Sequence, residues 1–496
     1  MGATLVWLRR DLRLADQPAL HAAVERGLPV IPVFIHAPEE EAPWQPGAAS
    51  NWWLHHSLTR LAEALEQRGS RLILRKGESL STLLDLARET GADAIFWNRL
   101  YEPAVIRRDQ EIKRTLRDSG LTVTSFNAAL LHEPWRIATG SGEPYKVFSP
   151  FWKACRRAGI DIAPERPDAR IPAPDQRVTG SDATDAGAAS DSKWPASTPL
   201  DTLNLLPGIP WDRGLAESWT PGEAGAWERF RNFIDEAVRG YGKGRELPGR
   251  HGTSRLSPHL HFGEISPRQV IWALRDAGLD LDAGGPEHFV REVGWREFGH
   301  HLLYHFPHTT DAPLNPRFLD FPWRESERDL RAWQQGRIGI PIVDAGMREL
   351  WQTGWMHNRA RMIVASLLTK NLRLHWLHGA RWFWDTLVDA DLASNTLGWQ
   401  WAAGSGADAA PYFRIFNPVL QGERFDADGR YVRQYVPELD GVPDANLHAP
   451  WRQKRKTDGQ AAPDGYPEPI VDLKTSREAA LEAFATIRKP PPPANP

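Results

Sequence analysis

The stretch between Trp355 and Arg414 carries the densest set of reactive and polar side chains in this 496-residue chain. It reads WMHNRARM, then DADLASNTLGWQW, then ADAAPYFR, which places indoles, carboxylates, amides and guanidiniums at helical spacings in an apolar setting. Tryptophan is usually highly buried, and several lie close together here: Trp376, Trp382, Trp384, Trp399 and Trp401. Polarisable rings beside a few polar groups favour a buried cofactor that handles electrons, although a large helical core explains most of the chain's 23 tryptophans.

Asp389 and Asp391 are carboxylates set two residues apart, and together with Asn395 they lead into Trp399 and Trp401. Carboxylates in an apolar context need partners, because burying an unpaired charge is costly. A ribose hydroxyl, a protonated ring nitrogen or a buried arginine would each serve as a partner. The histidine and carboxylate spacing of zinc and two-metal motifs is missing, so the sequence predicts no metal site.

The segment PEHFVREVGWREFGHHLLYHF predicts a helix in which Glu292, Trp295 and Arg296 stand at i, i+3 and i+4 and share one face. A carboxylate and a guanidinium beside an aromatic plane could bind a planar, partly polar ligand, with the ring stacking on it. A Glu–Arg pair over a core tryptophan explains this segment equally well.

The next long helical pattern places Trp355, Asn358 and Met362 at 0, +3 and +7, which predicts an indole, a carboxamide and a thioether along one stripe. Arg361 lies close to this face, whereas His357 is expected to project away as a structural residue. The soft thioether adapts to an irregular surface, but a methionine also fills gaps in a core.

The motif GTSRLS at Gly252–Ser257 precedes a helical run. Backbone amides and hydroxyls at a helix start, beside the guanidinium of Arg255, form an anion site that suits a phosphate or pyrophosphate. Helix capping by Thr253 or Ser254 is the alternative interpretation, and it needs no ligand.

The composition limits the classes of protein that fit the chain. A length of 496 residues indicates two or three domains. A net charge of -3 and a pI near 6.6 exclude a protein that coats nucleic acid through its overall charge, and leave room for one local basic face. The one cysteine, Cys155, excludes a disulfide framework and is interpreted as an ordinary core or surface residue. The N-terminus has no stretch apolar enough for a signal peptide or membrane span, so we expect a soluble, cytoplasmic protein.

Periodicity predicts an α/β fold for the first part of the chain. Up to about Leu131, short β-rich runs interleave with amphipathic stretches, which predicts a doubly wound parallel sheet with helices on both faces. The expected strands are TLVWL, PVIPVFI, RLILRK, AIFWN and TVTSF, and the expected helices include 57–69 and 79–90. No G-x-G-x-x-G follows the first strand and no Walker motif is present, so a nucleotide is not required here.

A zone from Ala163 to Leu206, rich in Pro, Asp, Ser, Ala and Gly, predicts a long surface connector that is disordered in part. Beyond it nearly all periodic segments are helical, which predicts an all-α domain. These segments include 223–239, 267–277, 288–304, 344–369 and 382–389. The predicted domains are therefore an α/β domain at 1–131, a linker at 132–206, a large all-helical domain at 207–488 and a disordered Pro-rich tail at 489–496.

Several long motifs resemble the photolyase and cryptochrome family, and most of all its class I cyclobutane pyrimidine dimer (CPD) photolyases. They span nearly the whole chain and read LVWLRRDLRLAD, YKVFSPFWKA, GTSRLSPHL, WREF, IVDAGMRELWQTGWMHNRARM, DADLASNTLGWQW and DAAPYFRIFNP. In that family an N-terminal α/β domain is joined by a long linker to a helical domain that holds FAD in a U-shaped conformation. The resemblance implies the same organisation here, and the activity of a light-dependent DNA repair lyase.

Carried over residue by residue, the resemblance implies where FAD would bind. The implied contacts are Tyr241, Thr253, Ser254, Arg255, Leu256, Ser257, Arg296, Trp355, Asn358, Arg361, Asp389, Asp391 and Asn395. The GTSRLS loop becomes the pyrophosphate site, and Asn395 faces the reactive nitrogen of the isoalloxazine and tunes its reduced form. Trp399, Trp376 and Trp323 match a chain that passes electrons from the surface to photoexcited flavin.

The resemblance also implies a pocket for the DNA lesion. Trp295 and Trp401 would stack on the dimer, Glu292 and Asn358 would hydrogen-bond the thymine carbonyls, and Met362 would pack where the bases separate. Photolyases flip their target base out of the duplex, and a lesion with disturbed stacking is easier to extrude.

The implied reaction is driven by light. Excited, fully reduced FAD donates an electron to the dimer, the cyclobutane ring opens, and the electron returns to the flavin. Glu292 would stabilise the charge that arrives on the base. Arg245 and Arg359 match positions that contact DNA phosphates and position the strand without reading its sequence. The expected partner is UV-damaged DNA, and a monomer is expected.

Two departures from the family patterns bear on the substrate and the antenna. The (6-4) photolyases carry histidines where this chain has Asn358 and Met362, and their repair depends on proton transfer by histidine, so CPDs are favoured. The glutamate that holds a folate antenna is missing near Ala104 and Val105, and Thr310 replaces its companion lysine. The antenna is therefore a deazaflavin, a folate bound differently, or absent. A cryptochrome-like blue-light receptor is the alternative function, and retention of the lesion pocket argues against it.

Overall fold

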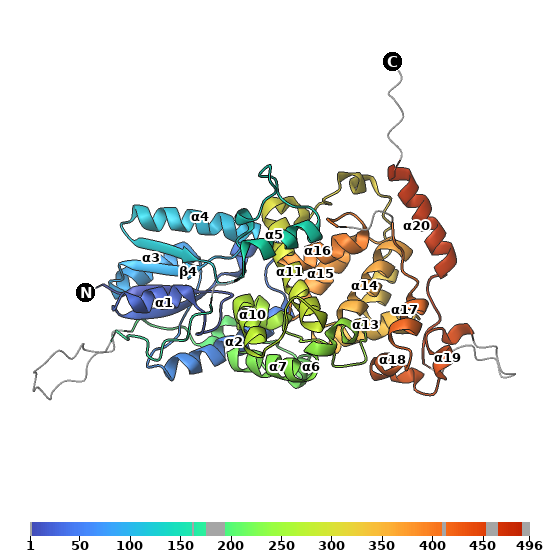
Figure 1. The fold of residues 1–496 in the computed structure, drawn as a ribbon, viewed down its shortest axis with the longest axis horizontal. Helices are drawn as coiled ribbons and strands as arrows, with labels where there is room; N and C mark the ends of the chain where they lie inside the picture. The colour runs from blue at the N-terminus through green and yellow to red at the C-terminus, as the bar shows by residue number, and fades with distance from the viewer. Residues whose placement is uncertain (1, 161–162, 175–193, 409–412, 453–464, 489–496) are drawn as a thin grey trace, which may run out of the picture.

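The computed structural model describes residues 2–160, 163–174, 194–408, 413–452 and 465–488. These residues form an elongated molecule with a β-sheet at one end and a larger helical part at the other (Figure 1). The predicted tail at 489–496 and the middle of the predicted connector, 175–193, lie outside the described residues.

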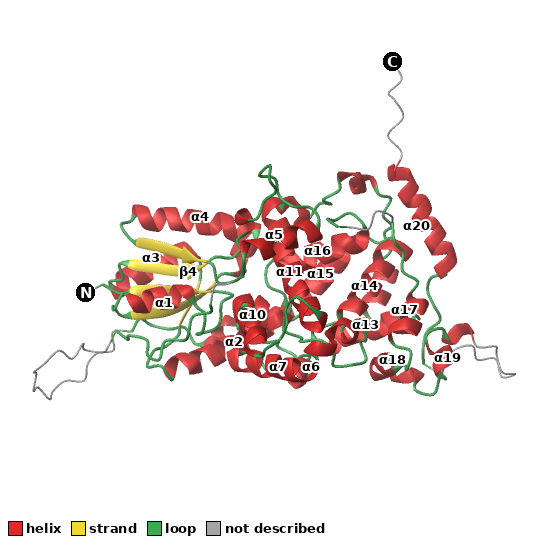
Figure 2. Cartoon of the chain, in the orientation of Figure 1, coloured by secondary structure: helices red, strands yellow, loops and turns green. Residues whose placement is uncertain are grey.

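Parallel strands form one sheet in the order β3-β2-β1-β4-β5 (Figure 2). Their bounds are β1 Thr4–Leu8, β2 Val30–His36, β3 Ile73–Lys76, β4 Ala94–Asn98 and β5 Thr122–Phe126. Each run predicted as a strand is confirmed, with shifts of about one or two residues at the ends of β2 and β3. The strand arrows in Figure 2 point toward the helical part, so the loops that follow the strands meet it there.

Alternation along the strands explains why helices cover both faces of the sheet. In β1, Leu5 and Trp7 pack into one apolar cluster with α3 (Ser79–Thr90) and α4 (Pro103–Asp118). Val6 and Leu8 point the other way, into a cluster with α1 (Pro18–Glu25) and α2 (Ala48–Glu66). The predicted doubly wound α/β unit is confirmed, although α2 begins at Ala48 instead of position 57.

The second part of the chain is helical, as predicted. Its α-helices are α6 Arg213–Ser218, α7 Glu223–Glu236, α8 Tyr241–Gly244, α9 Ser257–His261, α10 Pro267–Asp276, α11 Gly284–His305, α12 Glu327–Gln334, α13 Pro341–Thr353, α14 Asn358–Ser366, α15 Trp376–Thr386, α16 Leu392–Ala403, α17 Pro418–Phe425, α18 Arg430–Tyr435, α19 Asp444–Leu447 and α20 Leu473–Arg488. In the described part of this region, Arg324 and Leu374 form an isolated β-bridge.

The single helix predicted over 344–369 is wrong. Gly354 has a φ of 66° and ends α13, because this left-handed conformation is open to glycine and strained for other residues. Trp355 lies in the connection, and α14 begins at Asn358. His357 caps α14, since its Nδ1 accepts a 3.1 Å hydrogen bond from the backbone N–H of Arg359. The predicted stripe therefore contains Asn358 and Met362 but not Trp355.

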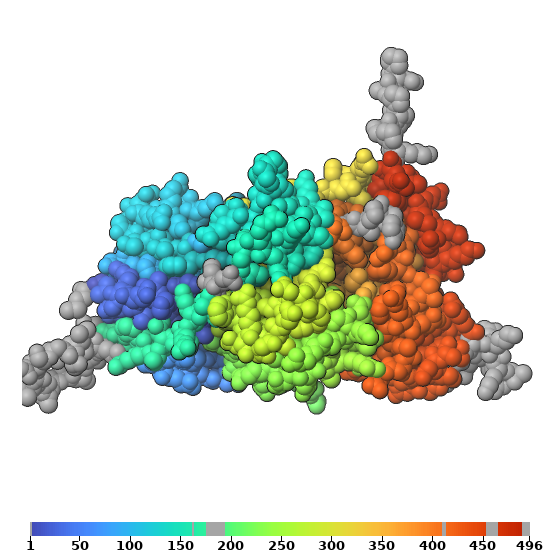
Figure 3. Space-filling view, in the orientation of Figure 1, coloured from blue at the N-terminus to red at the C-terminus, as the bar shows by residue number. Residues whose placement is uncertain are grey.

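The segment predicted as a surface connector is partly built into the molecule. Before it, α5 (Phe148–Ala158) packs against α11 and lies on the helical part (Figure 3). Further along, Ile171 is fully buried and its N–H donates to the carbonyl of Arg68 at 3.2 Å. Leu203 is also buried. Apolar side chains at wide intervals were enough to fix these stretches, which composition alone could not show.

Helices α15 and α16 approach closely because a glycine faces a tryptophan. A Cβ atom built on Gly379 of α15 would lie 2.0 Å from the Cη2 atom of Trp399 on α16. Trp399 is 2% exposed and also packs edge-on against Phe383, with ring centres 5.0 Å apart. The missing side chain thus determines where the Trp399 ring lies.

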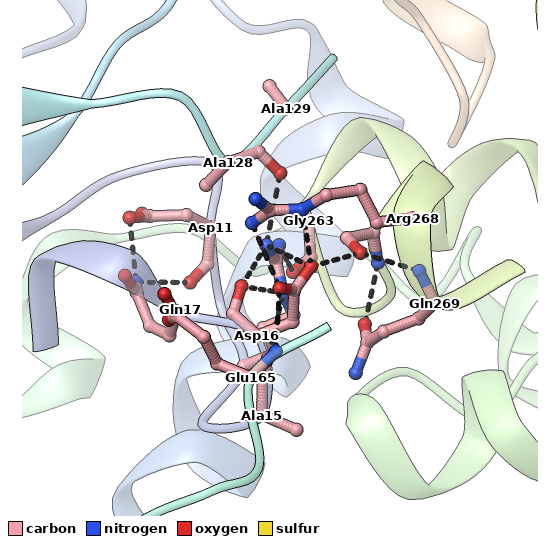
Figure 4. A network of polar contacts seen from close by, with 12 residues as sticks. Asp11, Ala15, Asp16, Gln17, Ala128, Ala129, Glu165, Gly263, Arg268 and Gln269 are labelled. Carbon is pink, nitrogen blue, oxygen red and sulfur yellow. Dashed lines mark hydrogen bonds and ion pairs between the residues drawn. The ribbon is translucent and has the colours of Figure 1, made fainter. Parts of the chain in front are cut away.

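The loop after β1 ties the sheet to the helical part (Figure 4). Arg13 is 1% exposed. Its guanidinium donates hydrogen bonds of 2.5 to 3.1 Å to the carbonyl oxygens of Ala15, Asp16, Ala128 and Gly263. Ala128 follows β5 and Gly263 follows α9, so one side chain joins the sheet loops to the helical part.

Asp16 extends this network on the helical side. Its carboxylate accepts hydrogen bonds from the Ser266 hydroxyl at 2.5 Å and from Arg268 Nε at 3.1 Å. Its other oxygen accepts from the backbone N–H of Glu165 at 3.1 Å. Both Arg13 and Asp16 are buried and fully engaged, which is the condition under which buried charges stabilise a fold.

Replacing Arg13 with methionine should lower the free energy of unfolding by about 3–5 kcal/mol, because buried carbonyl oxygens and Asp16 would lose their partner. Urea denaturation followed by circular dichroism measures this change. Arg60→Met is the control, since the Arg60 side chain is 60% exposed and pairs with Glu63 at the surface. The control should change the same quantity by less than about 0.5 kcal/mol, and equal losses in both variants would contradict the assignment.

Gly379→Ala should displace the Trp399 indole and destabilise the protein by about 1–3 kcal/mol, because the added methyl has no room. Near-ultraviolet circular dichroism and thermal unfolding report on both effects. Gly398→Ala on α16 is the matched control, since its Cβ would meet no described atom of a neighbouring element within 4 Å. That change should be neutral or stabilise by up to about 1 kcal/mol. An undisturbed near-ultraviolet spectrum in Gly379→Ala would refute the packing argument.

Candidate functional site

The Arg255 side chain lies between two indole rings in the loop that leads into α9. Its guanidinium carbon is 4.5 Å from the centre of the Trp219 ring and 4.7 Å from that of Trp355. Its backbone has a φ of 51°, a strained conformation for a non-glycine residue. Burial lowers the pKa of the guanidinium, and its Nε is buried without a hydrogen-bond partner among the described residues. A half-buried cation with an unpaired N–H suits an anionic ligand such as a pyrophosphate.

The helix-capping alternative for Thr253 and Ser254 is wrong. Helix α9 begins at Ser257, its N-cap position is Leu256, and no side chain caps it. The Ser254 hydroxyl instead accepts a 3.4 Å hydrogen bond from the backbone N–H of Leu256. The exposed Ser257 accepts a 3.2 Å hydrogen bond from Nε1 of Trp355, which joins this loop to the α13–α14 connection.

Asp389 pairs with an arginine, one of the partners that the sequence predicted, although Arg361 is only partly buried. Arg361 donates to both carboxylate oxygens of Asp389 at 2.8 and 3.1 Å, and its Nε donates to the carbonyl of Met356 at 2.7 Å. The Arg361 guanidinium also lies 5.8 Å from the centre of the Trp355 ring. Trp355 is therefore held between two cations, Arg255 and Arg361, beside one buried carboxylate.

Asp391 is surrounded by imidazoles. It caps α16 by accepting a 2.8 Å hydrogen bond from the backbone N–H of Ser394. Its other oxygen lies 3.7 Å from His261 Nδ1 and 3.5 Å from His300 Nε2. Burial alone would raise the pKa of Asp391, but His300, His261 and a nearby arginine hold it well below its usual range. A carboxylate that stays ionised is a strong acceptor for hydroxyl groups of a ligand.

Asn395 and Arg296 extend this second group. Asn395 lies one helical turn after Asp391, and its Nδ2 donates to the carbonyl of Ala380 on α15 at 3.0 Å. That bond holds the Asn395 amide against α15 through its NH2 group. Arg296 donates to the carbonyl of Ala129, in the loop after β5, at 2.7 Å.

The predicted FAD contacts thus form two linked groups. One contains Arg255, Trp355, Arg361 and Asp389, with Ser257. The other contains Asp391, Asn395 and Arg296. A cation with an unpaired N–H, the carboxylates and the amide fit a pyrophosphate, hydroxyl groups and a flavin ring edge, respectively. Tyr241 packs edge-on against Phe289, with ring centres 5.4 Å apart.

Glu292 does not pair with Arg296. Its carboxylate instead forms an ion pair with Arg245, and Arg359 forms an ion pair with Glu246. Glu246 also lies 3.8 Å from Arg245 Nε, so the four charges form a continuous row from α11 to the start of α14. The two arginines predicted to contact DNA and the predicted lesion residue Glu292 are therefore brought together.

Among the other residues predicted for the lesion, Trp295 lies on α11 with Glu292, and Asn358 and Met362 lie on α14 with Arg359. Trp295 stacks on Phe148, with ring centres 3.9 Å apart and planes 8° from parallel. Asn358 is exposed, and its Nδ2 lies 3.9 Å from the sulfur of Met362. Trp401 is half-buried and lines a small hollow with Lys370 and Arg414. Because one face of Trp295 is already covered by Phe148, a ligand can stack only on the other.

His357 is buried at 2% exposure, which fits its predicted structural role but not a side chain that projects away. Burial and the surrounding arginines lower its pKa to about 3. Its Nδ1 accepts the capping hydrogen bond, so its proton is on Nε2, which has no partner among the described residues. At neutral pH this imidazole is uncharged.

The predicted electron-transfer tryptophans span the helical part from its interior to its edge. Trp399 and Trp376 are both buried, and Trp399 lies over Gly379, one helical turn after Trp376. His375 packs against the Trp376 ring at 5.8 Å and against the half-buried Trp323 at 5.0 Å. Contacts therefore lead from Trp376 to Trp323 through a histidine ring.

A cavity of about 320 Å³ lies where the sheet part meets the helical part. Ala104, Val105 and Thr310, the positions expected to face an antenna, all line it. Its wall also contains Trp44 and Trp384, whose rings pack edge-on with centres 5.5 Å apart. The structure thus places the three positions at one cavity.

Two further findings concern the described residues as a set. They contain no cluster of three or more His, Cys, Asp or Glu side chains arranged to hold a metal ion. They also contain no helix with the length and hydropathy needed to cross a membrane. Cys155 is free and buried in the core, one of the two places expected for it.

Sequence reasoning missed several members of the site: Phe148, Glu246, His261 and His300. Glu246 directly follows Arg245, so an acid next to a proposed phosphate contact was a visible signal. The need of Asp391 for partners was visible, but the identity of the histidines was not, because they come from distant segments.

Two family profiles match the chain. The profile described as DNA photolyase matches residues 4–174, and the profile described as FAD binding domain of DNA photolyase matches residues 289–486. The second match confirms FAD as the cofactor predicted from the sequence.

Relatives cover almost the entire chain. The deoxyribodipyrimidine photo-lyase of Agrobacterium fabrum is 48% identical over 98% of both chains. Cryptochrome-2 of Arabidopsis thaliana is 40% identical over 98% of this chain and 79% of its own. The crystal structure of a bacterial class III photolyase from Agrobacterium tumefaciens superposes with a TM-score of 0.91 at 47% identity, over 99% of this chain and 98% of its own.

These relatives bear on the predicted class and enzyme. Assignment to class I is not supported, because a relative of known structure that is 47% identical is a class III photolyase, and the motifs identified the family without resolving its classes. The predicted enzyme type, a photolyase, is confirmed by the photo-lyases among the relatives. The chain belongs to the photolyase and cryptochrome family.

Proposed function

We propose that this protein repairs cyclobutane pyrimidine dimers in UV-damaged DNA under light, as a cytoplasmic monomer. The observation that carries the proposal is the row of charges that joins Glu292 to the start of α14, where Asn358 and Met362 lie. This row supports the proposal, because the residues in it or next to it include a hydrogen-bond acceptor, an amide, an apolar thioether and two arginines. These are groups that a flipped pyrimidine pair and its phosphates would need.

The contacts of Glu292 limit the hydrogen bonds it can form. Its carboxylate forms an ion pair with Arg245, and carboxylate oxygens accept hydrogen bonds. Glu292 therefore suits a ring N–H of thymine better than the carbonyl suggested by the family resemblance. The Asn358 amide can donate to a carbonyl, while Trp295 and Trp401 offer flat faces to the bases and Met362 fills the space between them.

FAD, when bound and reduced, supplies the photoexcited electron donor. The chain's own residues hold the bases in place and stabilise the negative charge that reaches them. An ionised carboxylate alone would repel that charge, so we assign the stabilisation to the Arg245–Glu292 pair with its guanidinium. No side chain needs to act as a nucleophile.

The (6-4) alternative requires a protonated histidine at the lesion. His357 is the histidine directly before Asn358, and its pKa of about 3 leaves it neutral and buried at physiological pH. It therefore cannot act as the acid, and Asn358 and Met362 cannot transfer protons. These side chains favour dimer repair over (6-4) repair.

The boundary cavity suits the predicted antenna. Its volume of about 320 Å³ is in the range of small-molecule sites, and tryptophans in its wall offer stacking surfaces. Neither Val105 nor Thr310 supplies the charge of the usual folate contacts. A deazaflavin and a folate bound in another way remain the two candidate chromophores.

Reduced protein should restore thymines in a single-stranded oligonucleotide that contains one dimer under blue light, as measured by recovery of absorbance at the thymine band. Glu292→Ala should lower repair per absorbed photon by about tenfold or more, with flavin content unchanged. Glu287→Ala, on the same helix but outside the charge row, should repair normally. Persistence of the dimer with reduced FAD bound to the unaltered protein would refute repair and favour a cryptochrome-like receptor.

Arg255→Met should weaken FAD binding by about 10- to 100-fold, because the pyrophosphate would lose a charge-assisted hydrogen bond in a buried site. The ratio of flavin to protein absorbance after gel filtration measures the loss. Arg250→Met is a nearby exposed control and should retain full flavin content. Full retention of flavin in Arg255→Met would show that the pyrophosphate binds elsewhere.

A further inference from the structure

In the proposed lesion site, the positive charges of the row are balanced by negative ones. Glu292 pairs with Arg245, and Glu246 pairs with Arg359. The four side chains are between 16% and 31% exposed, so solvent screens their interactions less than it screens pairs on the open surface. The two arginines that could attract DNA phosphates are therefore neutralised by neighbouring glutamates.

Arg359 is held in one orientation. One face of its guanidinium lies over the Phe425 ring, 4.3 Å from the ring centre. Its Nε is buried and has no hydrogen-bond partner among the described residues, whereas one NH2 group binds the carboxylate of Glu246. Carboxylate and phosphate oxygens bind guanidinium in the same manner. Glu246 thus occupies the edge of Arg359 that a phosphate would use.

Glu292 and Glu246 differ in what DNA offers them. A lesion would give Glu292 a new partner when it leaves Arg245, so its displacement is coupled to the lesion. Glu246 gains no such partner, and an adjacent phosphate would repel it. Displacing Glu246 from Arg359 therefore costs binding free energy for every DNA strand, damaged or undamaged.

We propose that Glu246 is an internal competitor of the DNA backbone, which occupies Arg359 in the free protein and lowers its affinity for phosphodiesters. This inference rests on the proposed function, in which Arg359 contacts a DNA phosphate. Weak backbone binding leaves the contacts to the lesion as the main source of affinity. The protein consequently spends less time on intact strands, in keeping with its net charge of -3.

The test compares Glu246→Gln with the unaltered holoenzyme in the dark. The probes are a fluorescein-labelled single-stranded oligonucleotide with one thymine dimer and its undamaged twin, titrated by fluorescence anisotropy at several salt concentrations. We expect the variant to bind both strands about three- to tenfold more tightly near 0.1 M salt. The slope of log K against log salt should become steeper by about 0.7, the value for one added phosphate contact on a single strand.

Two controls separate the direct contact from a change in net charge. Glu287→Gln removes the same charge from a carboxylate beside Arg291 and His288, and it should change affinity less than twofold. In an Arg359→Gln background, Glu246→Gln should have less than a twofold effect. Flavin absorbance and circular dichroism verify that each variant is folded.

The outcomes are distinct. Unaltered affinity in Glu246→Gln, or an equal gain in the Arg359→Gln background, would overturn the inference. If the unaltered protein neither prefers nor repairs the dimer strand, the proposed function fails, whereas the effect of Glu246 on the undamaged strand is still measured. Repair by the unaltered protein together with no gain in Glu246→Gln would reject only the role of Glu246.

Discussion

A fully buried guanidinium in the loop after the first strand determines how the two parts of the chain meet. Arg13 needs several carbonyl oxygens at once, and they come from its own loop, from the loop after β5 and from the turn after α9. Water cannot replace them, so only one arrangement of these segments satisfies it. Helix α9 also carries His261, which faces Asp391, and therefore the geometry of the proposed flavin site depends on this contact.

Charge compensation is the second principle of the structure. Ion pairs within the protein engage Asp389, Glu292 and Arg359. Asp391 lies next to the imidazole of His300. Such pairing offsets the free-energy cost of burying charged groups in a helical core when no ligand is bound. Arg255 is the exception, because its Nε lacks a hydrogen-bond partner among the described residues and its cation faces rings instead of a carboxylate. Binding energy for an anionic group is therefore concentrated at that loop.

Much of the fold could be predicted from the sequence, because local patterns determine it. β-Rich runs between turns gave all the strands, and the helix at Ser79–Thr90 was located to the residue. The break at Gly354 was not predicted, since apolar periodicity continues across it and only the backbone angle reveals it. The position of Ile171 likewise depends on a distant partner, Arg68, which no local sequence pattern could predict.

The candidate site was predictable in its members and less so in its pairings. Motif resemblance identified Glu292, Arg245 and Arg359 one by one, but it could not show that the first two bind each other. Side-chain partners across elements depend on how helices pack, and a single sequence contains no record of that. The stacking of Phe148 on Trp295 is of this kind, because the two residues come from helices far apart in the chain.

The glycine break between α13 and α14 has a consequence for how this site can vary. In a continuous helix, Trp355, Asn358 and Met362 would lie on one stripe, and a change in tilt would move them together. Because Gly354 ends the first helix, Trp355 is anchored by Ser257 and the cations around it, whereas Asn358 and Met362 follow α14. The proposed lesion residues Asn358 and Met362 and the proposed flavin contact Trp355 therefore lie on separate backbone segments. Arg361 of α14 still links them, because its guanidinium lies against the Trp355 ring.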